Sequence, residues 1–307
     1  MRKFRTTVLG AALLSLALIA SACGGSGGDD KKDAGGGEEK GEITVGSDSF
    51  AEAQIVGEMY AQVLEHHGYT VKRQLDFESR EPRLAAMESG DVDVAPEYLA
   101  SLLSVVAPEE TPSGDTAEAA EQLTAPLEAK GLELLEPSEV IDTNAFVVTQ
   151  GTADDQGLST VSDLAPVAGD LTLGAPTECP ERPFCIPGLK KTYGIEFGDF
   201  KPLEYGASIT ALSGGEIDVA LLFSTDGSIS ENEFVVLEDD KQLQAADTIT
   251  PLIRSDALTD EIAELLNGVS AALVTEEITE LNRRANVDVE DAADLAKEYL
   301  EDKGLLE

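Results

Sequence analysis

The sequence predicts an α/β protein built from two lobes of related construction. Short runs of β-forming residues alternate with helical segments along most of the chain, which is typical of sheets flanked by helices. A short motif that joins a helix to a strand occurs twice, once in each half of the chain. The length of 307 residues and the hydrophobic content of 42% suffice for one large or two medium domains with real cores.

The first half begins with a predicted strand at residues 43–45, followed by a helix that starts near Ser49. Ser49 and Glu52 have the spacing of a capping box, in which the serine caps the first turn and the glutamate returns the hydrogen bond. Apolar residues then recur every three or four positions, so we expect one buried helix face. The next predicted elements are a strand at 69–77, a helix at 82–89 and a strand at 92–95.

The second half repeats this alternation and ends in helices. Helical segments separate most of its predicted strands, which lie near residues 145–149, 171–174, 202–205, 217–222 and 234–237. Three amphipathic helices follow, around Ile262, Ile278 and Leu295, and we expect them to pack back on a lobe.

The repeated motif is AAMESGDVDVA at residues 85–95 and TALSGGEIDVA at residues 210–220. In both copies a short helix ends at glycine and leads into a strand in which an aspartate precedes Val-Ala. Two copies of one helix-to-strand unit predict two lobes with the same internal construction.

Residues 1–22 are predicted to be a lipoprotein signal peptide. Arg2, Lys3 and Arg5 precede an apolar run at residues 8–20, and small residues precede Cys23. The apolar run is shorter than the roughly 20 residues that a membrane-spanning helix needs, and no later stretch reaches that length. We therefore expect export, and no transmembrane segment in the mature chain.

Cys23 is the expected lipid anchor, because residues 19–23 resemble a bacterial lipobox, in which the cysteine is acylated. Residues 23–41 follow as a linker of Gly, Ser, Asp, Glu and Lys that cannot bury surface, which predicts a flexible tether. The alternative is a secreted soluble protein cleaved after Ala22. With the anchor, the protein lies on the extracytoplasmic face of the cell membrane.

The charge balance and the histidine count exclude several classes of function. There are 21 Lys and Arg against 60 Asp and Glu, and a formal net charge of −39 argues against nucleic-acid binding. A hydrolase is disfavoured, since no convincing nucleophile motif occurs and the only histidines are His66 and His67. A metal site lacks ligands for the same reason, so we expect no cofactor. Cys179 and Cys185 are expected to form a disulfide in an oxidising compartment.

Two groups of motifs follow one another along the chain. The first half contains GSDSFAE at 46–52, IVGEM at 55–59, SGDVD at 89–93 and PEY at 96–98. The second half contains PGLKKTYG at 187–194, GEIDV at 215–219, STDG at 224–227 and VVLEDD at 235–240. In these motifs the chain resembles the glycine betaine/choline (quaternary ammonium) substrate-binding proteins of ABC importers, and the resemblance runs in order from Ile43 to Leu305.

The resemblance implies a two-lobed periplasmic-binding-protein fold of type II, in which each lobe is a mainly parallel sheet flanked by helices. The first lobe is then expected at residues 42–142 plus 252–307 and the second at residues 143–251. It also implies a monomer that closes on a small ligand and delivers it to a permease with its ATPase subunits. No catalysis is implied.

The resemblance further implies a cage of aromatic rings for a quaternary ammonium group and an arginine for a carboxylate. Tyr98 matches a cage tyrosine and Arg182 the carboxylate-binding arginine. Both residues come from loop or strand-end positions, where lobed α/β folds bind ligands. The full set of candidate ligand-binding residues is Asp48, Ser49, Tyr98, Ser101, Asp142, Asn144, Arg182, Ile209, Phe223 and Thr225.

Some positions depart from the family pattern and leave the ligand open. Ile209 and Phe223 stand where the family has tyrosine, Asn144 replaces the tyrosine of Asp-Thr-Tyr, and Asp48 replaces a lysine. We therefore expect Asp48 to offer a negative charge to a cationic ligand. The open alternatives are glycine betaine, choline or carnitine, an amino acid or other cationic metabolite taken up or sensed by the same fold, and, least favoured, a lipid-anchored enzyme.

Overall fold

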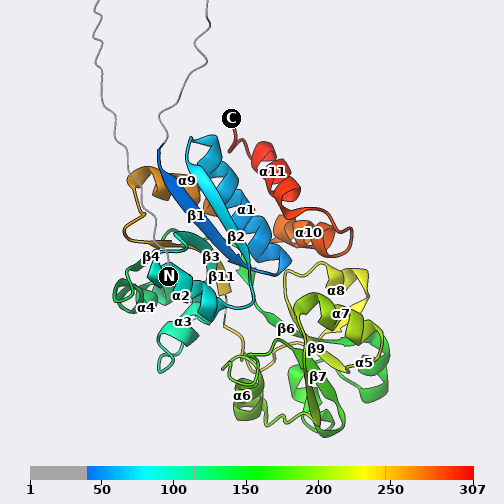
Figure 1. Cartoon of the computed structure of the whole chain (residues 1–307). Coiled ribbons are helices and arrows are strands. Elements are labelled where there is room, and N and C mark those ends of the chain that lie inside the picture. The colour runs from blue at the N-terminus through cyan, green and yellow to red at the C-terminus, as the bar shows by residue number, and fades with distance from the viewer. Residues whose placement is uncertain (1–39, 114, 246) are drawn as a thin grey trace, which may run out of the picture. The chain divides into compact units, whose positions relative to one another are not determined.

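The computed structural model describes residues 40–113, 115–245 and 247–307 (Figure 1). These residues belong to one compact unit, Glu38–Glu307. The expected signal peptide, the lipidated Cys23 and nearly all of the linker lie outside the described residues. Within the described ranges, no helix has the length and apolar character needed to cross a membrane.

The first lobe is built on a sheet with the strand order β2-β1-β3-β11-β4, and the short β5 also pairs with β11. β1 is parallel to β2 and β3, whereas β11 is antiparallel to β3, β4 and β5. The strands are β1 (Glu42–Asp48), β2 (Thr70–Phe77), β3 (Val94–Tyr98), β4 (Leu132–Leu134), β5 (Ile141–Asp142) and β11 (Asp247–Arg254).

Helices pack against this sheet and bury two apolar clusters. One cluster joins α1 to the three C-terminal helices, which confirms that the end of the chain packs back on the first lobe (Figure 1). The other cluster joins α2, α3 and α4. The helices are α1 (Ala51–His66), α2 (Arg80–Ser89), α3 (Leu99–Val106), α4 (Thr116–Glu128), α9 (Asp260–Ala272), α10 (Thr275–Asn286) and α11 (Ala292–Asp302).

The second lobe has its own sheet, with the strand order β10-β6-β9-β7-β8, and its own apolar clusters. β7 is parallel to β8 and β9, while β6 is antiparallel to β9 and β10. The strands are β6 (Asn144–Thr149), β7 (Thr172–Ala175), β8 (Asp199–Pro202), β9 (Val219–Phe223) and β10 (Phe234–Val236). The helices are α5 (Gln150–Gln156), α6 (Ile186–Gly188), α7 (Tyr205–Ser213) and α8 (Ser228–Glu231).

The repeated sequence motif has the same hydrogen bonds in both lobes. The Asp93 carboxylate accepts from the backbone N–H of Thr44 at 2.8 Å, and the N–H of Asp93 donates to the Thr44 carbonyl at 2.8 Å. In the second lobe the Asp218 carboxylate accepts from the N–H of Thr172 at 2.8 Å, and the N–H of Asp218 donates to the Thr172 carbonyl at 3.0 Å. Each aspartate thus ties the segment after the helix to the neighbouring parallel strand, β1 in the first lobe and β7 in the second, as two lobes of related construction require.

Two local expectations from the sequence are wrong. Ser49 does not cap α1, because its N–H is bonded to the carbonyl of Phe77 at the end of β2 and Phe50 occupies the N-cap position without a side-chain hydrogen bond. The strand expected at 202–205 lies earlier, at Asp199–Pro202, and α7 begins at Tyr205.

The structure also differs from the expectation in the strand directions of the sheets and in one lobe boundary, and both differences arise where the chain passes between the lobes. Both sheets are mixed, because the chain passes between the lobes and the strands next to the passages, β6 and β11, run antiparallel to their neighbours. β11 lies in the first sheet from Asp247 onward. The first lobe therefore resumes before the boundary at residue 252 that the sequence suggested.

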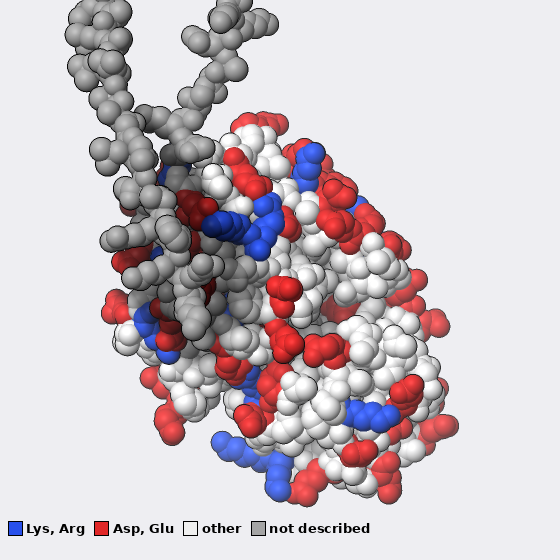
Figure 2. All heavy atoms as spheres, in the orientation of Figure 1, with Lys and Arg blue, Asp and Glu red and all other residues white. Residues whose placement is uncertain are grey.

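The surface reflects the acidic composition. On the face shown in Figure 2, acidic side chains are spread over both lobes and basic ones are few and scattered. Such a surface attracts cations and repels polyanions.

Candidate functional site

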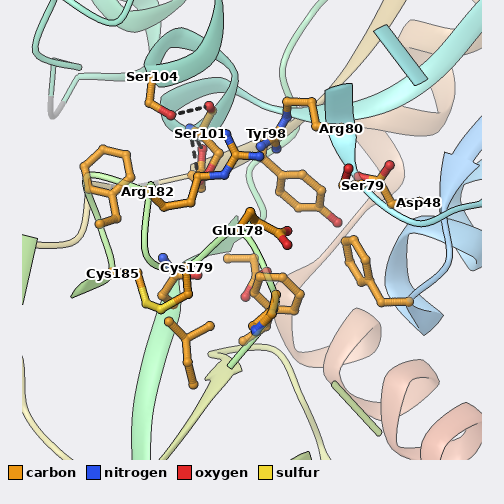
Figure 3. A pocket seen from close by; sticks show the side chains of 18 of the residues that line it. Asp48, Ser79, Arg80, Tyr98, Ser101, Ser104, Glu178, Cys179, Arg182 and Cys185 are labelled. Carbon is orange, nitrogen blue, oxygen red and sulfur yellow. Dashed lines mark hydrogen bonds between the residues drawn. A yellow bond between two sulfur atoms is a disulfide. The ribbon is translucent and has the colours of Figure 1, made fainter. Parts of the chain in front are cut away.

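A pocket, here called the interlobe pocket, lies between the lobes and is lined by residues of both (Figure 3). The first lobe contributes the end of β1, the end of β3 and the start of α2. The second lobe contributes the start of β6, the end of β9 and the loop that follows β7. Most of the candidate residues lie here, namely Asp48, Ser49, Tyr98, Ser101, Asp142, Asn144, Arg182 and Phe223.

Aromatic rings from both lobes form one side of the pocket. The ring centroids of Phe50 and Tyr98 are 6.0 Å apart, and those of Phe50 and Phe223 are 4.9 Å apart. Phe50 and a further lining residue, Phe184, were not among the candidates. Phe50 could have been found from its place between the end of a strand and the start of a helix, where this fold class binds ligands.

The Tyr98 hydroxyl is held by a buried carboxylate. It donates a 2.8 Å hydrogen bond to Glu52 Oε1, while Glu52 Oε2 accepts from Thr225 Oγ1 at 2.5 Å and from Asn282 Nδ2 at 2.8 Å. Glu52 and Tyr98 belong to the first lobe and Thr225 to the second, so this network joins the lobes. Glu52 was predicted only as part of a capping box, because its burial depends on residues distant in sequence.

Glu52 and Asp142 are two buried acids whose charges interact. Desolvation by burial raises the pKa of Glu52, and hydrogen bonds from Thr225, Asn282 and Tyr98 only partly offset that effect. Burial and then the Glu52 charge raise the pKa of Asp142 well above its usual range, although Asp142 accepts hydrogen bonds from the Thr225 N–H and the Ser224 hydroxyl.

Asp48 does not offer the free negative charge that the sequence suggested. Its carboxylate pairs with the guanidinium of Arg83, with Nε 2.9 Å from Oδ1. Arg83 is fully buried and also lies 2.9 Å from Glu97, which pairs with Arg80 at 2.9 Å. Burial opposes ionisation of Glu97, but the charges of Arg80 and Arg83 lower its pKa overall. The two acids and two arginines of this cluster balance, because a buried arginine needs carboxylate partners.

Arg182 lies in the loop that Cys179 and Cys185 close with a disulfide, their Cα atoms 5.3 Å apart. Both cysteines are buried in the second-lobe core and line the pocket. Arg182 Nη2 reaches across to the first lobe, 2.6 Å from Glu81 Oε1 and 2.9 Å from Oε2. Burial opposes ionisation of Glu81, but the nearby guanidinium lowers its pKa.

Polar contacts fix the part of the pocket where the chain passes between the lobes. Asp247 accepts hydrogen bonds from the Ser101 N–H at 2.9 Å and from the Ser101 hydroxyl at 2.5 Å. Burial raises the pKa of Asp247. Asn144 donates from Nδ2 to Gln244 at 3.0 Å. Ser101 and Asn144 thus lie in the pocket as expected, but each already has a protein partner.

Two candidates do not line the interlobe pocket. Ile209 lies on α7 and borders a neighbouring cleft. Thr225 borders the same cleft and is buried, with its hydroxyl committed to Glu52. Among the described residues, no three His, Cys, Asp or Glu side chains are arranged to hold a metal ion.

A pocket enclosed by two α/β lobes, with strand ends and loops as its walls, defines the chain as a two-lobed solute-binding protein. The family model described as the substrate binding domain of ABC-type glycine betaine transport systems matches residues 41–302, so the chain belongs to that family. Both the family resemblance and the two-lobed periplasmic-binding-protein fold predicted from the sequence are therefore confirmed.

Named relatives cover the chain along most of its length. A carnitine transport binding protein of Listeria monocytogenes is 29% identical over 100% of this chain and 99% of its own. A glycine-betaine-binding protein of Pseudomonas aeruginosa is 27% identical over 86% and 89%. A crystal structure of a glycine betaine/carnitine/choline ABC transporter protein superposes with a TM-score of 0.67 at 28% identity, covering 86% of this chain and 100% of that one.

Proposed function

We propose that the protein is the extracytoplasmic substrate-binding subunit of an ABC importer, and that it captures a small quaternary ammonium solute in the interlobe pocket. The aromatic cluster of Phe50, Tyr98 and Phe223 is the observation that carries this proposal. A trimethylammonium group has no N–H to donate, and it binds ring faces with roughly 0.5–2 kcal/mol for each contact.

The charges of the pocket favour a cation. Six carboxylates line it against two guanidinium groups, those of Arg80 and Arg182. Both guanidinium groups pair with carboxylates outside the lining, Arg80 with Glu97 and Arg182 with Glu81. Arg83 neutralises Asp48, and burial raises the pKa of Asp142 and Asp247, so the charge that favours a cation comes from Glu78, Glu178 and Glu204. The six lining carboxylates are Asp48, Glu78, Asp142, Glu178, Glu204 and Asp247.

The residues assigned to binding have separate roles in this proposal. Phe50, Tyr98 and Phe223 hold the methylated nitrogen, and Asp142, Ser101 and Asn144 supply polar contacts at the passage between the lobes. Arg182 orients the opposite end of the ligand. The printed names of the relatives support carnitine, glycine betaine and choline as the ligand class.

Closure of the lobes distinguishes the protein with bound ligand from the empty protein. Ligand that contacts both lobes favours the closed arrangement by its difference in affinity for closed over open. A permease with its ATPase subunits then accepts the closed monomer. We further propose that acylated Cys23 tethers this monomer to the membrane, which mass spectrometry of the wild type and a Cys23→Ser variant tests.

Calorimetric titration of the exported domain with choline, glycine betaine and carnitine tests the function. We expect at least one of them to bind, and scattering to show contraction when it does. Arg182→Ala should then change which ligands bind, whereas Lys190→Ala should not, because it removes an exposed pair with Glu196 that does not line the pocket. Silence of all three ligands, with a basic amino acid binding in their place, would favour the alternative of amino acid uptake.

A further inference from the structure

Glu81 already pairs with Arg182, the guanidinium that is expected to bind a ligand carboxylate. Its two carboxylate oxygens lie 2.6 and 2.9 Å from Arg182 Nη2, and among the described residues Glu81 is the one ion-pair partner of that guanidinium. Glu81 does not line the interlobe pocket, whereas Arg182 does. Arg182 therefore lines the pocket while its charge is already balanced by a carboxylate outside the pocket.

The pair also joins the lobes. Glu81 lies in the first turn of α2 in the first lobe, and Arg182 lies in the disulfide loop of the second. The side chain of Glu81 is 51% exposed and that of Arg182 is 21% exposed, so the pair sits at the edge of the pocket with access to solvent. Such a pair can form and break without leaving a buried charge alone, which costs far more.

Carboxylates of the protein would repel a ligand carboxylate bound at Arg182. Glu81 holds one nitrogen of the guanidinium, and Glu178 is a further acid in the lining of the pocket. A second anion on one guanidinium adds repulsion between like charges, unless Glu81 moves away. A ligand that carries only an ammonium group has no such cost.

We infer that Glu81 sets the selectivity of the site between quaternary ammonium ligands with and without a carboxylate, by competing with the ligand carboxylate for Arg182. The inference rests on the proposed function and adds to it a residue that lies outside the pocket. With Glu81 present, the site favours a monocation such as choline over a zwitterion such as glycine betaine. Without Glu81, Arg182 is free to bind a zwitterion.

Titration calorimetry of the wild type and Glu81→Gln with choline and glycine betaine tests the inference. We expect the affinity ratio of glycine betaine to choline to rise by about two- to fivefold in Glu81→Gln, the range of a partly exposed ion pair. Glu88→Gln is the matched control. It also removes a negative charge from α2, but Glu88 pairs with Lys130 and not with Arg182. That control should leave the ratio unchanged.

A double-mutant cycle separates competition at Arg182 from a general change of charge. In an Arg182→Gln background, Glu81→Gln should no longer raise the ratio. An unchanged ratio in Glu81→Gln, with either ligand still binding the wild type, overturns the role of Glu81 and leaves the proposed function intact. An equal rise in Glu88→Gln also overturns it. Binding of carnitine alone to the wild type overturns this inference and leaves the proposed function intact, whereas silence of choline, glycine betaine and carnitine overturns both.

Discussion

Phe50 and Phe223 approach one another from opposite lobes, with ring centroids 4.9 Å apart and planes inclined at 41°. Phe50 precedes α1, and Phe223 ends β9. Because both rings also line the interlobe pocket, the aromatic wall is complete only while the lobes are together. An ammonium group that contacts both rings therefore has higher affinity for the closed arrangement than for the open one.

Replacing either ring with an aliphatic side chain tests this link. We expect Phe50→Leu and Phe223→Leu each to weaken binding of choline by about 1–2 kcal/mol, because leucine keeps apolar volume but has no ring face for a cation. Titration calorimetry measures the loss. Phe200→Leu, a half-buried ring packed on the second-lobe core, controls for a general loss of stability. Full affinity in both pocket variants would place the ammonium elsewhere.

Tyr98 combines a ring face with a hydroxyl, and two substitutions separate them. Tyr98→Ala removes both, and we expect it to weaken binding by about 2 kcal/mol or more, as truncation of a buried anchor does. Tyr98→Phe keeps the ring and removes the donor to Glu52, so it should retain most of the affinity while lowering the free energy of unfolding. If Tyr98→Phe lost as much affinity as Tyr98→Ala, the hydroxyl rather than the ring would hold the ligand.

Asp142 should make the protein less stable as the pH rises. Burial and the Glu52 charge raise its pKa in the folded state above the usual value of 3.8, so the folded protein holds this proton more tightly than the unfolded chain. The stabilising contribution is present below pH 3.8 and is lost as the pH rises through the raised value. Asp142→Asn removes the contribution of Asp142 to this dependence, so we expect the free energy of unfolding of the variant to fall less than that of the wild type between pH 4.5 and 7.5.

Urea unfolding at the two pH values measures that change. Asp240→Asn is a control in which the effect of pH on stability has the opposite direction. A hydrogen bond from Ser162 lowers the pKa of Asp240, so the folded state favours its ionised form and this contribution to stability is lost as the pH falls. If the free energies of unfolding of the wild type and of Asp142→Asn changed in parallel with pH, Asp142 would be ionised in the folded protein.

The fold was predictable because its signals are local. The apolar spacing of α1 fixed which residues face the core, and Val56, Met59, Tyr60, Val63 and Leu64 are all buried. The two helix-to-strand motifs likewise predicted two lobes, since each aspartate bonds to the neighbouring parallel strand of its own lobe.

The chemistry of the pocket was less predictable because it depends on partners distant in sequence. Asp48 was expected to carry a free charge, but Arg83 neutralises it from 35 positions away. Glu52 has the spacing of a cap and instead bonds Thr225, 173 positions away. Phe50 was overlooked because the helix start was assigned to Ser49. In each case the sequence shows the residue type but does not show which distant side chain it contacts.

The disulfide between Cys179 and Cys185 should matter more for ligand choice than its short loop suggests. Closing a loop of this size stabilises a fold by about 2 kcal/mol, mainly by restricting the unfolded chain. Arg182 lies inside the loop, and both sulfur atoms are buried in the second-lobe core, so the bridge also fixes where the guanidinium points. Cys179→Ser with Cys185→Ser should therefore lower the melting temperature and reduce affinity for glycine betaine more than for choline. Wild-type protein treated with a reductant should behave like the double variant, and an unchanged ratio of the two affinities would show that the loop holds Arg182 without the bridge.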